Sequence, residues 1–205
     1  MIDTLCKASA QMGIALDVAQ SEALQRLLNE LNDWNQRINL TAIRDPQQQL
    51  TKHLLDSLSI QPHLRGRYIA DVGTGAGFPG LPLAVINPEK EFLLIDSINK
   101  KLRFVEHAAQ AMQLQNVAVL HTRAQDYRPA RLFDSVVSRA MGSIENFVQW
   151  CGHLCAPQGR LLAMKGRYPD EELAAVPKGW QVVAVHELKI SGLDEQRHLV
   201  ELCRK

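Results

Sequence analysis

Residues 71–77 read Asp-Val-Gly-Thr-Gly-Ala-Gly and continue the apolar run 68–70, Tyr-Ile-Ala, so the sequence predicts a strand that passes directly into a glycine-rich turn. Glycines at positions 73, 75 and 77 let the backbone turn tightly and approach a ligand more closely than any side chain would permit. The alternative is a tight turn that binds no ligand. Three closely spaced glycines make a turn entropically costly, however, and the close approach of a ligand to the backbone would explain that cost. We therefore interpret this turn as a cofactor-binding site.

Beyond the turn, short apolar runs alternate with stretches of helical character. The runs that we expect to be strands are 68–72, 92–96, 117–121, 135–138 and 159–164. This alternation is typical of a parallel sheet covered by helices on both faces. Residues 180–186 and 198–203 follow each other with only a polar loop between them, which predicts an antiparallel C-terminal hairpin. The expected fold is α/β and Rossmann-like, with a mostly parallel seven-stranded sheet.

The segment before the first strand has a different pattern. Apolar residues recur at helical spacing through 17–37, and 2–12 and 46–58 also have helical character. We therefore expect an N-terminal helical extension over 1–65 and a Rossmann-like domain over 66–205.

The bulk composition is that of an ordinary globular protein. The chain has 205 residues, 46% hydrophobic and 22% charged, and a formal net charge of +1. No run approaches the ~20 apolar residues that a membrane span needs, and the start does not resemble a secretory signal. We expect a cytoplasmic protein without a metal site, whose four scattered cysteines stay reduced.

Two classes of nucleotide cofactor compete for the glycine turn. Residues 75–80 match the dinucleotide string G-x-G-x-x-G, which alone is a weak signal, and Gly73 and Thr74 intervene between the strand and that string. Asp71 lies where a carboxylate meets a ligand ammonium, which a methionine moiety has and a nicotinamide dinucleotide lacks. Asp96, about 20 residues beyond the turn, suits the ribose hydroxyls of either cofactor, or else caps the following helix. After Asp96 the chain has room to complete only one sheet, so the sequence favours S-adenosylmethionine over a dehydrogenase cofactor.

Basic residues follow several of the predicted strands, at the edge where open α/β sheets bind their ligands. Singly, each is an ordinary surface charge, but together they favour a polyanionic acceptor such as a nucleic acid. Residues 138–141 read Ser-Arg-Ala-Met, where amino-group methyltransferases carry Asp/Asn-Pro-Pro-Tyr/Phe and pyrimidine C5 enzymes a Pro-Cys nucleophile. A ring nitrogen with an in-plane lone pair, such as guanine N7, needs neither a covalent intermediate nor a general base. Orientation of that lone pair is then the main catalytic effect.

Distinctive motifs are spread over nearly the whole chain: Trp34-Asn35, Asn39-Leu40-Thr41, His53-Leu54-Leu55-Asp56-Ser57, Asp71 through Pro82, Leu94-Ile95-Asp96-Ser97, Ser138-Arg139-Ala140, Lys165-Gly166 and Arg197-His198-Leu199. In these motifs the chain resembles the bacterial glucose-inhibited division protein B family, the small-subunit ribosomal RNA methyltransferase G enzymes. The resemblance implies a class I methyltransferase that moves a methyl group from S-adenosylmethionine to N7 of a guanine in 16S (small-subunit) ribosomal RNA, near the decoding region. The implied partner is this RNA, free or within the 30S subunit, and we expect a monomer with no membrane contact.

The predicted site residues form two sets. The cofactor set, partly carried over by position and partly argued above, is Asp71, Gly73, Gly75, Phe78, Asp96, Ala124, Gln125 and Arg139. The family pattern has Glu where this chain has Gln125. The acceptor-positioning set is Arg123, Arg139, Lys165, Arg197 and His53, and no residue is predicted to act as a catalytic acid or base. Two alternatives stay open: a non-catalytic RNA-binding ribosome assembly factor on the same fold, and a nicotinamide-dependent dehydrogenase supported only by the glycine string.

Overall fold

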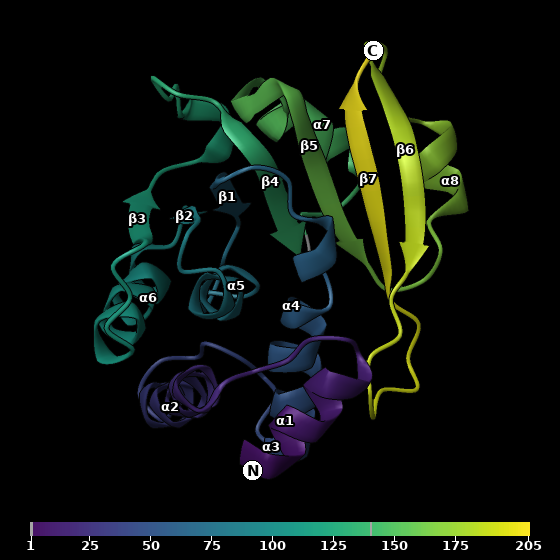
Figure 1. Ribbon diagram of the computed structural model, residues 1–205. Coiled ribbons are helices and arrows are strands. Elements are labelled where there is room, and N and C mark those ends of the chain that lie inside the picture. The colour runs from purple at the N-terminus through teal and green to yellow at the C-terminus, as the bar shows by residue number, and fades with distance from the viewer. Residues whose placement is uncertain (1, 140) are drawn as a thin grey trace.

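The computed structural model describes residues 2–139 and 141–205, so Ala140 of the quoted motif and Met1 of the predicted extension lie outside the described residues. A seven-stranded sheet with the order β3-β2-β1-β4-β5-β7-β6 forms the centre of the molecule (Figure 1). Its strands are β1 (Tyr68–Val72), β2 (Glu91–Asp96), β3 (Val117–His121), β4 (Phe133–Arg139), β5 (Cys155–Lys165), β6 (Trp180–Glu187) and β7 (His198–Arg204). The first five strands pair in parallel, and β7 pairs antiparallel with both β5 and β6. The predicted α/β fold, with its mostly parallel sheet and C-terminal hairpin, is confirmed.

The largest departure from the predicted strands is at β5, which begins at Cys155 rather than at 159. Phe133 of β4 pairs with Cys155, whereas Ser135 pairs with Arg160, so the register shifts between these pairs. A bulge of this kind inserts extra residues into one strand, and Pro157 and Gly159 are residue types that bulges accept. The apolar pattern is interrupted there, which is why it predicted only the regular part of the strand.

Helices cover both faces of the sheet. On one face α5 (Gly80–Ile86) and α6 (Asn99–Ala111) pack on alternate strand residues such as Phe92 and Leu94. On the other face α7 (Ile144–Cys151) packs on Leu93 and Ile95. Successive strand residues point to opposite faces of the sheet, and helices cover both faces, so all of these residues are buried. The strands are therefore continuous apolar runs in the sequence.

The N-terminal helices share the first of these two cores. They are α1 (Ile2–Gln11), α2 (Val18–Asn35), α3 (Pro46–Gln49), the π-helical η1 (Leu50–Leu55), α4 (Asp56–Leu58) and the 3-10 turn η2 (Gln61–His63). A capping box at Asp17 and Gln20 starts α2, whose buried leucines join α5 and α6 in one hydrophobic cluster. The boundary between 1–65 and 66–205 stays a prediction, because this core runs across it.

Three short elements complete the described chain: η3 (Ala124–Asp126), η4 (Gly152–Leu154) and α8 (Asp170–Ala174). Among the helices of residues 2–139 and 141–205, none combines the length and apolar character required to cross a membrane.

Candidate functional site

The glycine turn after β1 adopts a backbone that requires glycine. Gly73, Gly75 and Gly77 have φ values of +69°, +59° and +85°, in the left-handed region that other residues rarely adopt. The backbone N–H groups of Gly73 and Thr74 donate to the carbonyl of Ile95, at 2.8 Å and 3.1 Å. These bonds hold the turn against the carboxyl end of β2, where α/β sheets bind ligands.

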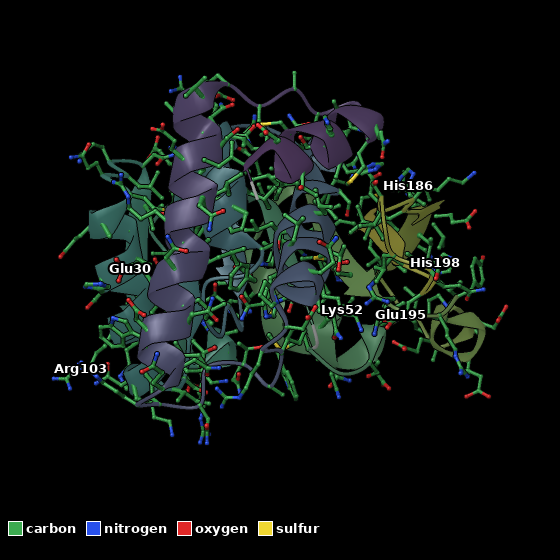
Figure 2. The ribbon with its side chains drawn as sticks, turned by 90° about the horizontal axis from the view of Figure 1, so that it is seen from below. Glu30, Lys52, Arg103, His186, Glu195 and His198 are labelled. Carbon is green, nitrogen blue, oxygen red and sulfur yellow. The ribbon has the colours of Figure 1, made fainter. Side chains whose placement is uncertain are left out.

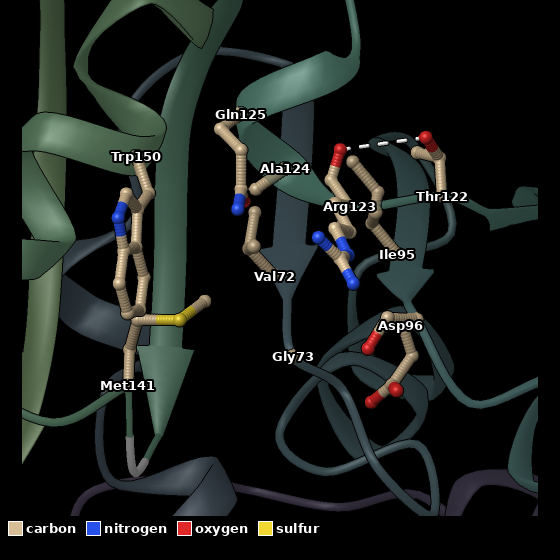
Figure 3. Close-up of a pocket in the computed structure, with 11 residues that line it drawn as sticks. Val72, Gly73, Ile95, Asp96, Thr122, Arg123, Ala124, Gln125, Met141 and Trp150 are labelled. Atoms are coloured by element: carbon tan, nitrogen blue, oxygen red, sulfur yellow. Dashed lines mark hydrogen bonds between the residues drawn. The ribbon is translucent and has the colours of Figure 1, made fainter.

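A cavity of 240 Å³, hereafter the first cavity, opens beside this turn (Figure 3). Its lining comes from the ends of β1 and β2, the segment 122–125, the chain after β4, and α7: Val72, Gly73, Ile95, Asp96, Ser97, Thr122, Arg123, Ala124, Gln125, Met141 and Trp150. The Asp96 carboxylate accepts hydrogen bonds from the backbone N–H groups of Gly75 and Ile98, each at 2.8 Å. Asp96 is thereby held in a fixed orientation at the edge of the cavity, and it does not cap α6, whose N-cap is Ile98.

The first cavity contains half of the predicted cofactor set. Four members line it: Gly73, Asp96, Ala124 and Gln125. The other four, Asp71, Gly75, Phe78 and Arg139, are not among its lining residues. Arg123 was grouped with the acceptor bases but lies in this cavity, and sequence reasoning missed Thr122, Met141 and Trp150. None of the three carried a local signal in the sequence, because the packing of α7 and of the chain after β4 brings Trp150 and Met141 to the cavity.

Asp71 lies beneath the turn, on the side away from the first cavity. Its side chain is buried, and Oδ2 accepts hydrogen bonds from Thr74 Oγ1 at 2.6 Å and from the N–H of Gly80 at 2.8 Å. Oδ1 is buried without a hydrogen-bond partner among the described residues. Burial raises the pKa of this carboxyl to about 6, although the donors from Thr74 and Gly80 oppose the rise. Asp71 therefore clamps the two ends of the turn, and the burial of its charge lowers the stability of the fold.

Replacing Asp71 by asparagine is expected to alter the pH dependence of folding. The Asp71 carboxyl has a pKa of about 6 in the folded protein, whereas in the unfolded chain it ionises near pH 4. Between pH 4 and pH 6 only the unfolded chain releases this proton, so the stability of the wild type falls as the pH rises through this range. Asp71→Asn has no carboxyl to titrate and does not lose this stability. Between pH 4 and pH values above 6, the free energy of unfolding of the variant should therefore rise relative to that of the wild type by at most about 3 kcal/mol. Urea unfolding of both proteins from pH 4 to pH 8 measures the difference. A difference that does not change with pH would contradict the assignment.

A second cavity, of 460 Å³, lies at the carboxyl ends of β4 and β5. The residues that line it are Arg139, Gly142, Met164, Lys165, Gly166 and Arg197. It brings together Arg139, Lys165 and Arg197, three of the five predicted acceptor bases. The two cavities are neighbours along the chain, because Met141 lines the first and Gly142 lines the second.

The three bases of the second cavity are each paired with an acid. Lys165 Nζ lies 2.7 Å from Glu172 of α8. Arg139 Nη1 lies 3.3 Å from Asp56 Oδ2 and also donates to the Lys52 carbonyl at 3.0 Å. The sequence predicts the bases and not these acids, because Asp56 lies 83 residues from Arg139 and no local pattern links Lys165 to Glu172.

Arg197 makes the remaining pairs. Its Nε lies 3.2 Å from Asp56 Oδ1, and its Nη2 lies 2.9 Å from Glu195. Figure 2 shows Glu195 next to Lys52, with which it also forms an ion pair of 2.6 Å. The second cavity is therefore lined by fixed guanidinium and ammonium groups whose charge is largely balanced.

His53 differs from the bases with which the sequence grouped it. It is buried, its ring stacks on Phe78 with centroids 4.8 Å apart, and its Nε2 lies 2.9 Å from Thr41 Oγ1. Burial, and secondarily the charge of Arg139, lowers the pKa of His53 to about 4. His53 is thus neutral near pH 7. Phe78 lies under the Arg139 guanidinium as well, 5.6 Å from the ring centroid, so Phe78 and His53 form a stacked support beneath Arg139.

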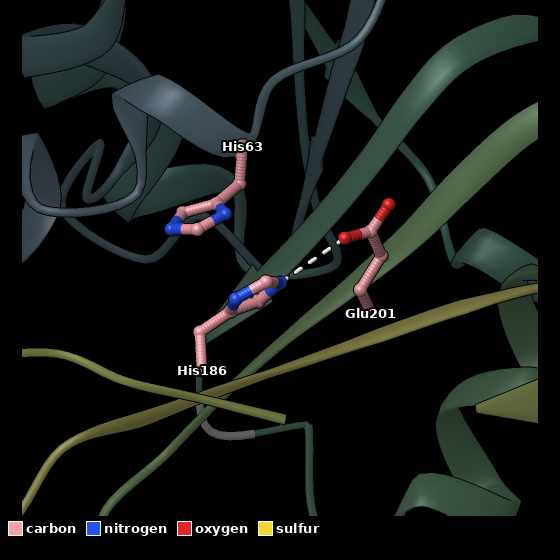
Figure 4. A group of neighbouring side chains, drawn as sticks. All are labelled: His63, His186 and Glu201. Atoms are coloured by element: carbon pink, nitrogen blue, oxygen red, sulfur yellow. Dashed lines mark hydrogen bonds and ion pairs between the residues drawn. The ribbon is translucent and has the colours of Figure 1, made fainter. Parts of the chain in front are cut away.

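A group of side chains with metal-ligating atoms lies elsewhere, between η2 and the C-terminal hairpin (Figure 4). The ligating atoms of His63, His186 and Glu201 lie within 4.8 Å of one another. However, the Glu201 carboxylate already bonds His186 at 3.1 Å and Arg160 at 2.9 Å, and Arg65 lies 3.8 Å away. A dication would add to this positive charge. We therefore interpret the cluster as an ion-pair network that fastens the hairpin to η2.

Two of the solved structures that resemble this fold are described as S-adenosylmethionine-dependent methyltransferases. A S-adenosylmethionine-dependent methyltransferase from Aquifex aeolicus superposes with a TM-score of 0.61 at 18% identity, over 77% of this chain and 93% of that one. One from Thiobacillus denitrificans, in complex with S-adenosyl-L-homocysteine, gives 0.56 at 13% identity, over 87% and 98%. At such identities the comparison establishes the class I methyltransferase fold.

Sequence comparison is more specific. A ribosomal RNA small subunit methyltransferase G from Aeromonas salmonicida is 47% identical over 93% of this chain and 92% of its own length. One from Marinobacter nauticus is 47% identical over 95% and 91%. The family model described as rRNA small subunit methyltransferase G matches residues 20–200, which include every residue of both cavities. With the fold, the glycine turn and this match in agreement, the chain belongs to the rRNA small subunit methyltransferase G family.

Proposed function

We propose that this protein transfers a methyl group from S-adenosylmethionine to N7 of a guanine in small-subunit ribosomal RNA. The observation that carries the proposal is that consecutive residues after β4 line two cavities, Met141 the first and Gly142 the second. A cavity suited to a nucleoside cofactor next to a cavity lined by bases is the arrangement that methyl transfer to a nucleic acid requires.

The residues of the first cavity fit the cofactor. The fixed Asp96 carboxylate has free lone pairs for the ribose hydroxyls, and the Gly73 backbone offers a surface without a side chain. The indole of Trp150 and the side chain of Gln125 flank the cavity where an adenine ring would lie (Figure 3). Bound there, S-adenosylmethionine supplies an electrophilic methyl group on its sulfonium.

The residues of the second cavity fit the acceptor. Arg139, Lys165 and Arg197 offer N–H donors to phosphate and to base edges, and their acid partners fix the direction of those donors. With S-adenosylmethionine bound, the lone pair of guanine N7 would accept the methyl group from the sulfonium, leaving neutral S-adenosylhomocysteine, and since N7 carries no proton, no general base would be needed. Holding the two groups in line is therefore the main task of the site, and orientation of this kind is worth at best ~7–11 kcal/mol.

The proposal extends to the setting of the reaction. The implied acceptor is the RNA of the small subunit, alone or assembled in the 30S subunit, and we place the protein in the cytoplasm, where that RNA is. We further propose that it acts as a monomer and that the reaction needs no metal ion. The names of the relatives support the RNA substrate.

Replacing Asp96 by alanine is expected to weaken cofactor binding about tenfold, because hydrogen bonds to a charged group are lost. The melting temperature should fall as well, since Gly75 and Ile98 lose their acceptor. Calorimetry with S-adenosylmethionine measures the first effect. Asp126→Ala is the matched control, because Asp126 is an exposed carboxylate in η3 that does not line the cavity. Equal affinities of the two variants would remove Asp96 from the cofactor site.

Transfer of a labelled methyl group to purified 30S subunits and to free small-subunit RNA tests the function. The proposal predicts incorporation that requires both the protein and S-adenosylmethionine. Cofactor and RNA binding without any incorporation would favour a non-catalytic assembly factor instead.

A further inference from the structure

Asp56 of α4 bridges the two arginines that line the second cavity. Its Oδ2 lies 3.3 Å from Arg139 Nη1, and its Oδ1 lies 3.2 Å from Arg197 Nε. Arg139 ends β4 and Arg197 immediately precedes β7, so one carboxylate from the N-terminal helices joins two ends of the sheet. These two pairs are ion pairs of one acid with two separate guanidinium groups.

The burial of the three side chains is unequal. The Asp56 side chain is 4% exposed, whereas those of Arg139 and Arg197 are 26% and 20% exposed. The acid is therefore closed off from an incoming acceptor, while each guanidinium keeps donors that face the cavity. Burial raises the pKa of the Asp56 carboxyl, and the two close guanidinium groups oppose this rise without cancelling it.

The helix that carries Asp56 has an unusual geometry immediately before it. The π-helical turn η1 (Leu50–Leu55) ends at the residue preceding Asp56, and π turns recur at functional sites. The extra residue in such a turn rotates the following side chains by about 100° relative to a continuous α-helix. The same turn presents the Lys52 carbonyl to Arg139 and the His53 ring to Phe78, so several supports of Arg139 come from it.

We propose that Asp56 is a positioning residue for the acceptor: it holds Arg139 and Arg197 in the relative geometry that orients the RNA at the second cavity. The inference rests on the proposed function and adds to it the role of the N-terminal helices. These helices then complete the site rather than only covering the sheet. Asp56 acts through the arginines and touches neither cofactor nor acceptor.

A double-mutant cycle tests this role. Asp56→Asn keeps the shape of the side chain and removes its charge, and we expect kcat/KM for 30S subunits to fall about 30-fold, while cofactor affinity changes less than about threefold. In the background of Arg197→Ala, the same substitution should lower kcat/KM only about threefold, because one of the two arginines through which Asp56 acts is already gone. A purely structural role of Asp56 would give the same loss in both backgrounds, and that result overturns the inference.

Glu195→Gln is the matched control. It removes another acid that pairs with Arg197, but this side chain is 53% exposed, so activity should stay within about threefold of the wild type. An equal loss for Glu195→Gln and Asp56→Asn would contradict a special role for the buried acid.

Two further results separate the inference from its assumptions. If the wild type transfers no methyl group to RNA, the proposed function fails; if it does and Asp56→Asn is as active, the inference alone fails. Should Asp56→Asn not fold, Asp56→Glu keeps the charge but moves the carboxylate by one methylene. We expect this variant to bind the cofactor normally with a reduced kcat, and a wild-type kcat would overturn the inference.

Discussion

Replacing Gly73 by valine is expected to abolish binding of S-adenosylmethionine, with an affinity at least about 100-fold below that of the wild type. Gly73 has a φ of +69°, a conformation that costs other residues roughly 1–2 kcal/mol, and more for a β-branched side chain. A Cβ at this position would lie 3.4 Å from the Met141 methyl group, and both residues line the first cavity. The branches of valine would therefore fill space that the cofactor needs.

The control for backbone strain is Gly13→Val. Gly13 has a φ of +76° and lies between α1 and α2, and a Cβ at this position would have no heavy atom of the described chain within 4 Å. Calorimetry on both variants, with their melting temperatures, separates strain from occlusion. Gly13→Val should lose stability and keep the cofactor. Normal cofactor binding by Gly73→Val would show that the first cavity is not the cofactor site.

Replacing Arg197 by alanine is expected to lower kcat/KM for RNA about 100-fold, while cofactor affinity changes less than about threefold. Arg197 lines the second cavity and not the first, and its Nε lies 3.2 Å from the buried carboxylate of Asp56. Its loss removes donors that the acceptor would use, and the remaining pair between Asp56 and Arg139 keeps the buried acid compensated. Steady-state kinetics on 30S subunits and calorimetry with the cofactor measure the two quantities.

Lys189→Ala is the control for charge. Lys189 is an exposed base between the same two strands, β6 and β7, and it lines neither cavity. This substitution removes one positive charge as well. An equal loss of kcat/KM in both variants would therefore mean that Arg197 contributes only to the overall positive potential of the protein. A large loss of cofactor affinity in Arg197→Ala would mean that the two cavities are not separate sites.

Local features of the sequence predicted the fold well. A strand buried on both faces is a continuous apolar run, and the run 92–96 lies within Glu91–Asp96 for that reason. The bulge that starts β5 at Cys155 and the π turn from Leu50 to Leu55 depend on tertiary packing, and no periodicity in one segment encodes them.

For the candidate site too, the sequence predicted those residues whose place depends only on their position along a strand. Gly73 and Asp96 line the first cavity because each lies where a strand ends at the ligand-binding edge. Asp71 is one residue before Val72 in the same strand, and since neighbouring residues face opposite sides, Val72 reaches the cavity while Asp71 points under the turn. Strand alternation could have predicted that difference.

The pairing of acids with the acceptor bases was not predictable. Asp56 and Arg197 are brought together only by the packing of the N-terminal helices against the ends of β4 and β7. An ion pair between residues so distant in sequence leaves no local pattern in a single chain. The sequence therefore indicated that bases gather at this edge but not how their charge is balanced.

The most direct test of the account is the position of the modified base. Small-subunit RNA, incubated with the protein and S-adenosylmethionine, is reduced and cleaved with aniline, which breaks the strand at N7-methylguanosine, and the break is located by primer extension. The account predicts one new break at a guanine, which depends on the cofactor and is absent with Gly73→Val. Methyl incorporation without such a break, or breaks at many guanines, would contradict specific N7 transfer.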